Sequence, residues 1–348
     1  MARQTKSNPT IVDIARKLGI SAMTVSRALN GKGDVSQEMR RKVVECAGRI
    51  GYRPHRWARS LVTQRSYMVG VIVPEIAHSF FAEIINGIED VLEKSGYDIL
   101  LCHSRSDPER ERNEIQALIG GRMDGLIVAP EQPEKSPEPF VDLRRLKIPF
   151  VLVDRFFPGW EFSCVRLDDL EAGFLATKFL IELGHRRIAH ISGPDLSTAS
   201  LRRRGFLKAL RQFGFEPDRR SIVAAPFGID EGRAAMKKLL RLEPRPTAVF
   251  AANDPQAIGA IYACREAGLR VPEDISIIGA GNIEGVYHPN PFLTTIDWPR
   301  QELGRAAAQV LLSAIGNPKT SQPEIRIFPP ELLIRHTTAP PNPFEPRR

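Results

Sequence analysis

The chain has 348 residues, enough for two or three domains with a large buried core, so it does not need disulfides or metals to fold. Its four cysteines lie far apart without a C-x-x-C pair, which argues against a zinc site or a disulfide framework and fits a reducing cytoplasm. The N-terminal stretch lacks the apolar segment of a signal peptide, and no run approaches the roughly 18 apolar residues of a membrane span. We therefore expect a soluble protein that is not exported.

The net charge of +8 is concentrated at one end of the chain. Residues 1–66 hold 14 Lys and Arg against four Asp and Glu, a net charge of +10, whereas the remainder holds 35 against 37. A small basic head on a near-neutral body is typical of a nucleic-acid-binding module joined to another domain. A basic solvated tail is the simpler alternative, but it would lack the apolar periodicity that this head has.

The head begins with two short amphipathic helices. Thr10 and Asp13 form a capping-box-like start to the first, and Gly19 ends it. Ser21 caps the second, whose Val25, Ala28 and Leu29 are expected to face inward. Two helices joined by a tight glycine-containing turn predict a helix-turn-helix, which lays its second helix in the major groove of DNA. An ordinary three-helix bundle would show a similar apolar pattern.

A third helix is predicted from Ser36, with four apolar residues closing a small core. They are Val43, Val44, Ala47 and Ile50. The following RPHRWARSLVTQRS, from Arg53, is a short basic segment that favours a helix but is too small to bury anything alone. Its presence beside the basic head favours DNA binding over a plain helical bundle.

From Tyr67 onward, apolar strands alternate with amphipathic helices in two successive runs. This alternation predicts parallel sheets with helices on both faces, arranged in two lobes. Ligands of such sheets bind beyond the carboxyl ends of the strands. Aromatic, carboxylate, amide and guanidinium groups gather there and suit a small hydroxylated or carboxylated molecule. The residues at these positions are Phe80, Phe81, Asp154, Arg155, Arg202, Phe227, Asn253, Asp254 and the stretch GAGN at 279–282. Asp154 and Asp254 have the alternative role of capping a helix.

The stretch ISIIGAGNIEG at 275–285 resembles a strand that opens onto a phosphate-binding glycine loop. The strict fingerprint requires a third glycine where this chain has Glu284, and a helix directly after the loop. Pro289 and Pro291 make a helix there improbable. We therefore expect no dinucleotide cofactor, and we find no P-loop, nucleophile elbow or metal-spaced cluster of His and Cys that would indicate an enzyme.

Taken together, TIVDIARKLGISAMTVSRALNG, the DVS before the third helix, GYRPHRWARSL, DGLIVAP, RPTAVFAAND and LRVPEDISIIG resemble the lactose/galactose repressor (LacI/GalR) family. The resemblance implies an all-α helix-turn-helix head and an α/β, two-lobed, periplasmic-binding-protein-like effector domain. The implied organisation is a DNA-binding domain (1–53), a hinge helix and linker (54–66), an effector and dimerisation domain (67–340) and a C-terminal tail (341–348). The hinge departs from the family at His55, where an asparagine is usual.

The resemblance also implies roles for individual residues. Ala22, Met23 and Arg27 sit where the family reads bases; Thr24, Ser26 and Asn30 support or contact the DNA backbone; Ala58 lies in the hinge helix, and Leu61 aligns with the leucine that wedges into the minor groove. Because Ala22 and Met23 cannot make bidentate bonds to bases, Arg27 is expected to carry most of the direct readout. A buried position for Met23 is the structural alternative.

The residues that line the effector cleft in relatives are matched by Phe80, Phe81, Asp154, Arg202, Phe227 and Asn253. An acid that is common in the family is replaced by Gly281, and Asn282 or Glu131 could substitute for it, unless the effector is itself anionic. We expect a cytoplasmic, nucleoid-associated homodimer that represses transcription from a pseudo-palindromic operator, binds a sugar or sugar acid, and uses no cofactor or metal. A transporter's solute-binding protein would share the body but carry an export signal and no basic head, and an α/β enzyme would need a catalytic motif.

Overall fold

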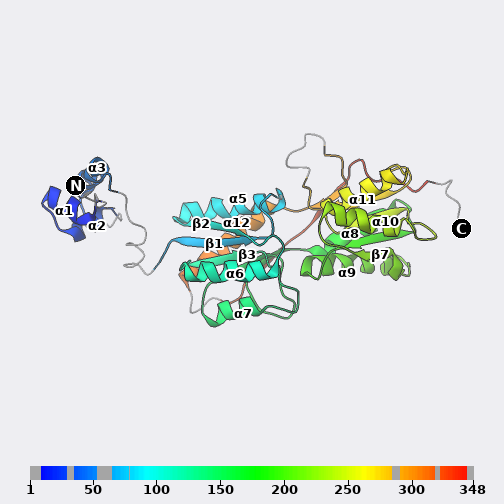
Figure 1. The fold of residues 1–348 in the computed structure, drawn as a ribbon, viewed down its shortest axis with the longest axis horizontal. Helices are drawn as coiled ribbons and strands as arrows, with labels where there is room; N and C mark the ends of the chain where they lie inside the picture. Colours follow the sequence, from blue (N-terminus) through cyan, green and yellow to red (C-terminus); the bar gives the residue numbers. More distant parts are fainter. Residues whose placement is uncertain are drawn as a thin grey trace, which may run out of the picture. The chain divides into compact units, whose positions relative to one another are not determined.

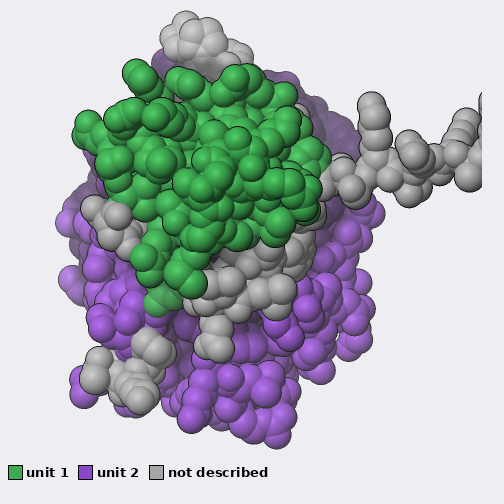
Figure 2. Space-filling view, turned by 90° about the vertical axis from the view of Figure 1, so that its left-hand side faces the viewer, with its two compact units in different colours: residues 1–66 green, residues 67–348 purple. Residues whose placement is uncertain are grey.

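The computed structural model describes residues 9–29, 35–52, 65–77, 79–283, 291–317 and 322–342. The chain divides into two compact units, residues 1–66 and 67–348, which are coloured separately in Figure 2. The finer divisions that the sequence predicts, at residues 53 and 340, stay predictions. Each unit is described by itself.

Within its described residues, the first unit packs three helices around one small core. They are α1 (Ile11–Leu18), α2 (Ala22–Leu29) and α3 (Gln37–Ile50). The Asp13 carboxylate accepts hydrogen bonds from the backbone N–H and the hydroxyl of Thr10, at 2.9 and 2.8 Å, and Gly19 ends α1 in the left-handed conformation with φ 65°. The Ser21 hydroxyl accepts from the Thr24 N–H at 3.0 Å, so the predicted start of α2 is confirmed.

One prediction about this core is wrong. Val44 is 55% exposed, and Cys46, at 4% exposed, takes the expected place beside Val43 and Ala47. Positions 43, 46, 47 and 50 follow the i, i+3, i+4, i+7 spacing of a single helix face, and Val44 lies about a quarter turn away from it. The valine therefore points to solvent although it is as apolar as its neighbour.

The second unit has two lobes, each built on a six-stranded sheet (Figure 1). The N-terminal lobe has all its strands parallel, in the order β11-β5-β4-β3-β1-β2. These strands are β1 (Met68–Val73), β2 (Asp98–His103), β3 (Gly125–Val128), β4 (Phe150–Asp154), β5 (Cys164–Leu167) and β11 (Ile325–Phe328). Helices α5 (Ser79–Leu92) and α12 (Arg300–Gly316) cover one face, and α6 (Pro108–Gly120) and α7 (Glu138–Arg145) cover the other.

The C-terminal lobe repeats the plan with the order β12-β10-β9-β8-β6-β7. Its strands are β6 (Ile188–Ser192), β7 (Ile222–Ala224), β8 (Ala248–Ala251), β9 (Ser276–Ala280), β10 (Thr295–Asp297) and β12 (Glu331–Leu333), of which only the β10–β12 pair is antiparallel. Helices α8 (Asp169–Glu182) and α9 (Ser197–Gln212) lie on one face, and α10 (Ile229–Leu239) and α11 (Asp254–Glu266) on the other. The predicted two-lobed α/β architecture is confirmed.

The chain passes between the lobes three times, at Asp168, at Trp298–Pro299 and at Pro329–Pro330. The Asp168 N–H donates to the Phe328 carbonyl at 2.9 Å, so the first and third passages lie side by side. The first of these passages lies directly beside Asp169, and the second lies directly beside Arg300.

Candidate functional site

The N-terminal end of α2 is exposed in the way that a groove-binding helix requires. Met23 is 64% exposed, so the alternative in which it fills the core is excluded. Arg27 is exposed on the same helix, whereas Ala22, Thr24 and Ser26 are half-buried. The inner face of α2 is held by Val25 and Ala28, both buried. Three further predicted DNA contacts lie outside the described residues: Asn30, Ala58 and Leu61.

The second candidate site is a cavity of about 230 Å³ in the cleft between the two lobes of the second unit. It lies beyond the carboxyl ends of the strands of both sheets, as the sequence predicts. Six of the seven predicted effector residues line it: Phe80, Phe81, Asp154, Arg202, Phe227 and Asn253. The lining also includes Pro74, Glu75, Ser106, Arg155, Thr198, Ala280 and Gly281.

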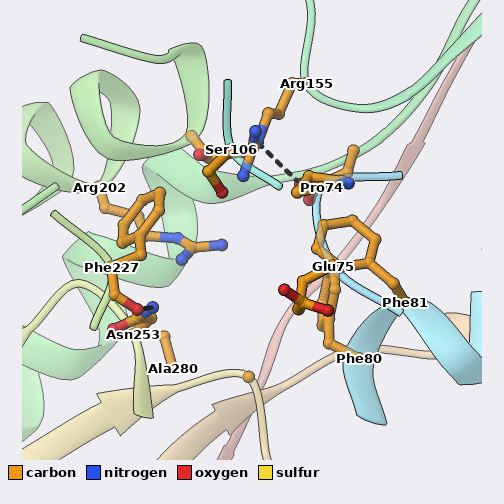
Figure 3. A pocket seen from close by; sticks show the side chains of 13 residues that line it. Pro74, Glu75, Phe80, Phe81, Ser106, Arg155, Arg202, Phe227, Asn253 and Ala280 are labelled. Carbon is orange, nitrogen blue, oxygen red and sulfur yellow. Dashed lines mark hydrogen bonds and ion pairs between the residues drawn. The ribbon is translucent and has the colours of Figure 1, made fainter. Parts of the chain in front are cut away.

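The walls of this cavity are aromatic, and they belong to different lobes (Figure 3). Phe80 and Phe81, in the first turn of α5, pack edge to face with ring centroids 5.1 Å apart. Phe227 follows β7 on the opposite wall and packs against Gly193, where an added Cβ would lie 2.3 Å from its ring. Between these walls the guanidinium of Arg202 points into the cavity. A flat or apolar ligand surface would meet rings from both lobes.

Arg202 is held by three groups from separate elements. Asp169 accepts from its Nε at 2.8 Å and from its Nη2 at 2.7 Å, and the Ala252 carbonyl accepts from its Nη1 at 2.6 Å. The ring of Trp298 lies 4.9 Å from the guanidinium carbon, in cation–π geometry. Burial raises the pKa of Asp169 to about 7, although Arg202 acts to lower it.

The backbone of α9 is pressed against α8 at the level of this pair. An added Cβ on Gly173 of α8 would lie 2.1 Å from the Arg202 carbonyl oxygen, and one on Gly205 of α9 would lie 2.1 Å from the Leu170 carbonyl oxygen. Only glycine permits such an approach. The two helices can therefore bring Asp169 and Arg202 together over the short distance that their bonds require.

Arg155 is neutralised by residues behind the cavity wall. Its Nη1 donates to the Pro130 carbonyl at 3.0 Å and pairs with the Glu131 carboxylate. The Glu131 N–H in turn donates to Glu111 at 2.6 Å, and burial raises the pKa of Glu111 to about 7. Glu131 thus serves to balance Arg155 and does not line the cavity.

Asp154 is the one carboxylate in the cavity wall that is buried and incompletely bonded. It is 4% exposed and has φ 67°, and one of its carboxylate oxygens has no hydrogen-bond partner within the described part of the chain. Its other oxygen lies 3.6 Å from the Nε of Arg155. Burial raises the pKa of Asp154, against the lowering effect of Arg155 and Arg202. A ligand hydroxyl or N–H would satisfy the remaining oxygen.

The residues after β8 and β9 fall into separate groups. Asn253 lines the cavity while it caps α11, accepting from the Gln256 N–H at 3.0 Å, and it donates to the Phe227 carbonyl at 3.1 Å. Asp254 faces away, accepting from the Ile283 N–H at 2.9 Å and from the Thr295 hydroxyl at 2.6 Å. Asn282 does not line the cavity, because its side-chain oxygen accepts from Arg335 at 2.7 Å. The structure therefore gives no support to Asn282 as the substitute for the missing acid.

The chain is similar to known proteins in both of its units. Residues 10–55 match the family model of bacterial regulatory proteins of the lacI family, and residues 177–338 match that of the periplasmic binding protein-like domain. The HTH-type transcriptional repressor CytR of Escherichia coli (strain K12) is 36% identical over 341 residues, covering 97% of this chain and 98% of that protein. The repressor PurR of Edwardsiella ictaluri is 36% identical over 333 residues, covering 95% and 97%.

Solved structures agree with these matches. The lac repressor dimer bound to operator and the anti-inducer ONPF has a TM-score of 0.83 and 26% identity, covering 96% of this chain and all of that one. The complex of the transcriptional regulator CelR with cellobiose has a TM-score of 0.72 and 31% identity, covering 95% of this chain and 100% of that one. Head, two-lobed body and cleft together define a bacterial transcription regulator of the helix-turn-helix class. The chain belongs to the LacI family of bacterial regulatory proteins.

No helix within the described residues has the length and apolar character needed to cross a membrane. The same part of the chain holds no group of three or more His, Cys, Asp or Glu arranged to bind a metal ion.

Proposed function

We propose that this chain represses transcription by binding a pseudo-palindromic operator as a homodimer, and that a small molecule in the interlobe cleft controls that binding. One observation supports the proposal above all. The same chain has a basic head with an exposed helix α2 and a body with a cavity lined by residues of both lobes. Relatives over almost the whole length are named as transcriptional repressors. We propose that the protein acts as a regulator and not as an enzyme, and that it binds DNA in the cytoplasm.

We assign direct base contact to Ala22, Met23 and Arg27, and support of the DNA backbone to Thr24, Ser26 and Asn30. Ala58 and Leu61 are assigned to a hinge helix that inserts into the minor groove. The exposure of Met23 and Arg27 on α2 supports this assignment. Met23 offers only an apolar surface, which suits a thymine methyl group, and Arg27 can form two parallel bonds to guanine.

The charges around the cleft favour a neutral, hydroxylated ligand over an anion. Arg202 is paired with Asp169, and Arg155 with Glu131, so neither guanidinium brings an unbalanced positive charge. Asp154 presents a carboxyl oxygen to the cavity, and in its ionised form this carboxylate would repel an anionic ligand. We therefore propose a sugar or similar polyol, held by Asp154, Arg202 and Asn253 between the rings of Phe80, Phe81 and Phe227.

The proposal is tested by recovering a duplex from a random DNA library with the full-length protein and measuring its affinity at several salt concentrations. Because phosphate contacts release counterions, affinity should fall at least roughly a thousandfold between about 50 and about 200 mM salt. A flat log–log dependence would contradict DNA binding through the basic head. A thermal-shift screen of sugars and sugar acids then identifies the ligand, because molecules bound only by the native state raise Tm.

A further inference from the structure

The cleft-lining loop at residues 280–283 belongs to the C-terminal lobe. It follows β9, and Asp254 fixes it through the Ile283 N–H at 2.9 Å. The Gly281 N–H donates to the Ile296 carbonyl of β10 at 2.8 Å, and Arg335 bonds the Asn282 side chain at 2.7 Å. The Asn282 N–H also donates to the Thr295 hydroxyl at 3.4 Å, so these bonds tie the loop to its own lobe, while Ala280 and Gly281 form part of the cavity wall.

The same loop is also fastened to the other lobe. Arg300 begins α12 directly after the second passage between the lobes, and its side chain is 6% exposed. Its Nη1 donates to the Gly281 carbonyl and, at 2.8 Å, to the Asp297 carboxylate, both in the C-terminal lobe. Its Nε pairs with Glu83, which lies on α5 of the N-terminal lobe. One buried guanidinium therefore joins α5 to the loop.

A second contact runs parallel to this one. The Ser79 hydroxyl, at the first residue of α5, donates to the Ile283 carbonyl at 3.3 Å, and Ser79 is 5% exposed. Between Ser79 and Glu83 on α5 lie Phe80 and Phe81, the rings that form one wall of the cavity. The two fastening points bracket the aromatic wall, so α5 cannot shift relative to the loop without breaking at least one of them.

We propose that Arg300 is a positioning residue that holds the 280–283 loop of one lobe against α5 of the other, so that a ligand that displaces Phe80 and Phe81 on α5 also displaces this loop. This coupling rests on the proposed function and deepens it. A ligand that pulls Phe80 and Phe81 toward Phe227 moves α5, and the bond chain from Glu83 through Arg300 to Gly281 carries that movement into β9 and β10. A ligand that makes better contacts in one arrangement of the lobes than in another shifts the population toward the first arrangement.

The chain offers a matched control for this inference. Asp90, seven residues after Glu83 on α5, accepts from the Nη2 of Arg305 on α12 at 2.8 Å. Both pairs join α5 to α12, but the bonds of Arg305 that the structure gives are to Asp90, Glu302 and Gln301, all on these two helices. Glu83→Ala removes the α5 end of a bond chain that continues through Arg300 to Gly281 in the other lobe, whereas Asp90→Ala removes a pair whose bonds stay on α5 and α12.

The test is hydrogen exchange of the full-length protein, followed by mass spectrometry of peptides that cover residues 276–283. Glu83→Ala should raise exchange at the Gly281 and Ile283 amides about fivefold or more, and Asp90→Ala should leave it within about twofold, because only the first loosens the loop. Equal effects of the two variants, or no effect of either, would overturn the proposal.

The second measurement repeats the exchange with the duplex recovered from the random library. Binding of the duplex should change loop exchange in the wild-type chain and in Asp90→Ala, but not in Glu83→Ala, because coupling between sites is reciprocal. A change that persists in Glu83→Ala overturns the coupling role. If no duplex is recovered, the proposed function fails, while the comparison of the two variants without DNA still decides whether the loop is fastened through Arg300.

Discussion

Asp169 binds the guanidinium of Arg202 at two nitrogens, 2.8 Å from Nε and 2.7 Å from Nη2, with the two side chains 1% and 7% exposed. The residues lie 33 positions apart, on α8 and α9, and Arg202 lines the cavity while Asp169 holds it from behind the lining. Asp169 directly follows the first passage between the lobes. Its bonds to Arg202 therefore fix the ligand-facing guanidinium relative to the point where the lobes are joined.

Removing the carboxylate should destabilise the protein strongly. Asp169→Ala leaves a buried arginine without its counter-ion, which costs about 3–5 kcal/mol of unfolding free energy. Urea denaturation measures this loss. The exposed pair of Lys178 and Glu182 on the same helix supplies the comparison, and Glu182→Ala should cost about 1 kcal/mol or less. Similar losses in the two variants would mean that burial does not govern the Asp169 pair.

The function of Arg202 is tested separately from stability. Arg202→Ala should abolish the response to the ligand that the thermal-shift screen identifies, while binding to the selected duplex persists, because the head is a unit of its own. The measurement is duplex affinity with and without that ligand. A variant that still responds at the wild-type ligand concentration would remove Arg202 from the cleft assignment.

Most of the cleft could be predicted, because its residues follow recognisable strands. Phe227 and Asn253 lie in the loops that follow β7 and β8, and the rule that ligands bind at the carboxyl ends of strands is enough to select them. Asp169 and Arg300 could not be selected in this way. They lie at helix starts beside the passages between lobes, and Arg300 meets Glu83 across 217 positions of sequence.

The position of Asn282 depends on a contact between segments that lie far apart in the sequence, which a residue's type does not specify. Asn282 and Gly281 are neighbours, yet only Gly281 lines the cavity, because Arg335, from a segment 53 positions away, holds the Asn282 side chain elsewhere. Apolarity alone predicts Val44 in the core, but its position on α3 turns it to solvent.

Stability should depend on pH through Glu111. Burial raises its pKa in the folded state from 4.5 to about 7, and the hydrogen bonds that it accepts from the Glu131 N–H and the Gln132 side chain only partly oppose the increase. The folded state therefore binds more protons than the unfolded state between about pH 4.5 and 7, so the contribution of this group to stability falls as pH rises through that range. Glu111→Gln should gain stability relative to the wild type by up to about 1 kcal/mol per pH unit.

The measurement is urea denaturation of the wild type and Glu111→Gln at pH 5, 6, 7 and 8. The difference between the two should grow up to about pH 7 and then level off, because the wild-type carboxyl is ionised above its pKa. His190, whose pKa burial lowers to about 4, is common to both proteins and cancels in the difference. A difference that is constant from pH 5 to 8 would show that Glu111 titrates normally.

Arg27 is expected to read a base. Arg27→Ala should cost about 1–3 kcal/mol of binding free energy on the selected duplex and should relax discrimination at one position in each half-site. Competition among duplexes that differ by single base pairs measures both effects. A uniform loss across all of these duplexes, with a salt slope reduced by about one, would instead indicate that Arg27 contacts phosphate.

Leu61 lies outside the described residues, and its role rests on the resemblance of GYRPHRWARSL to the family's hinge helix. An apolar wedge between base steps unstacks them and bends the duplex. Leu61→Ala should therefore reduce both the bend and the affinity, while the thermal shift given by the ligand stays unchanged. Gel mobility of circularly permuted duplexes reports the bend, and an unaltered bend would exclude the wedge.

Substitution of Gly281 is expected to lower the free energy of unfolding because of the backbone conformation at this position. Its φ of +132° is a conformation that residues with a side chain rarely adopt, although a Cβ there would meet only Ile283 and Asp254 at 3.6 Å or more. Gly281→Ala and Gly281→Asp should both lose about 1–3 kcal/mol of unfolding free energy, since the strain does not depend on the side chain's charge. Gly120, at the end of α6 with nothing within 4 Å of an added Cβ, is the control, and Gly120→Ala should be neutral or stabilising. If Gly281→Asp is as stable as the wild type, the backbone tolerates an acid at this position, and its absence must then be attributed to the ligand.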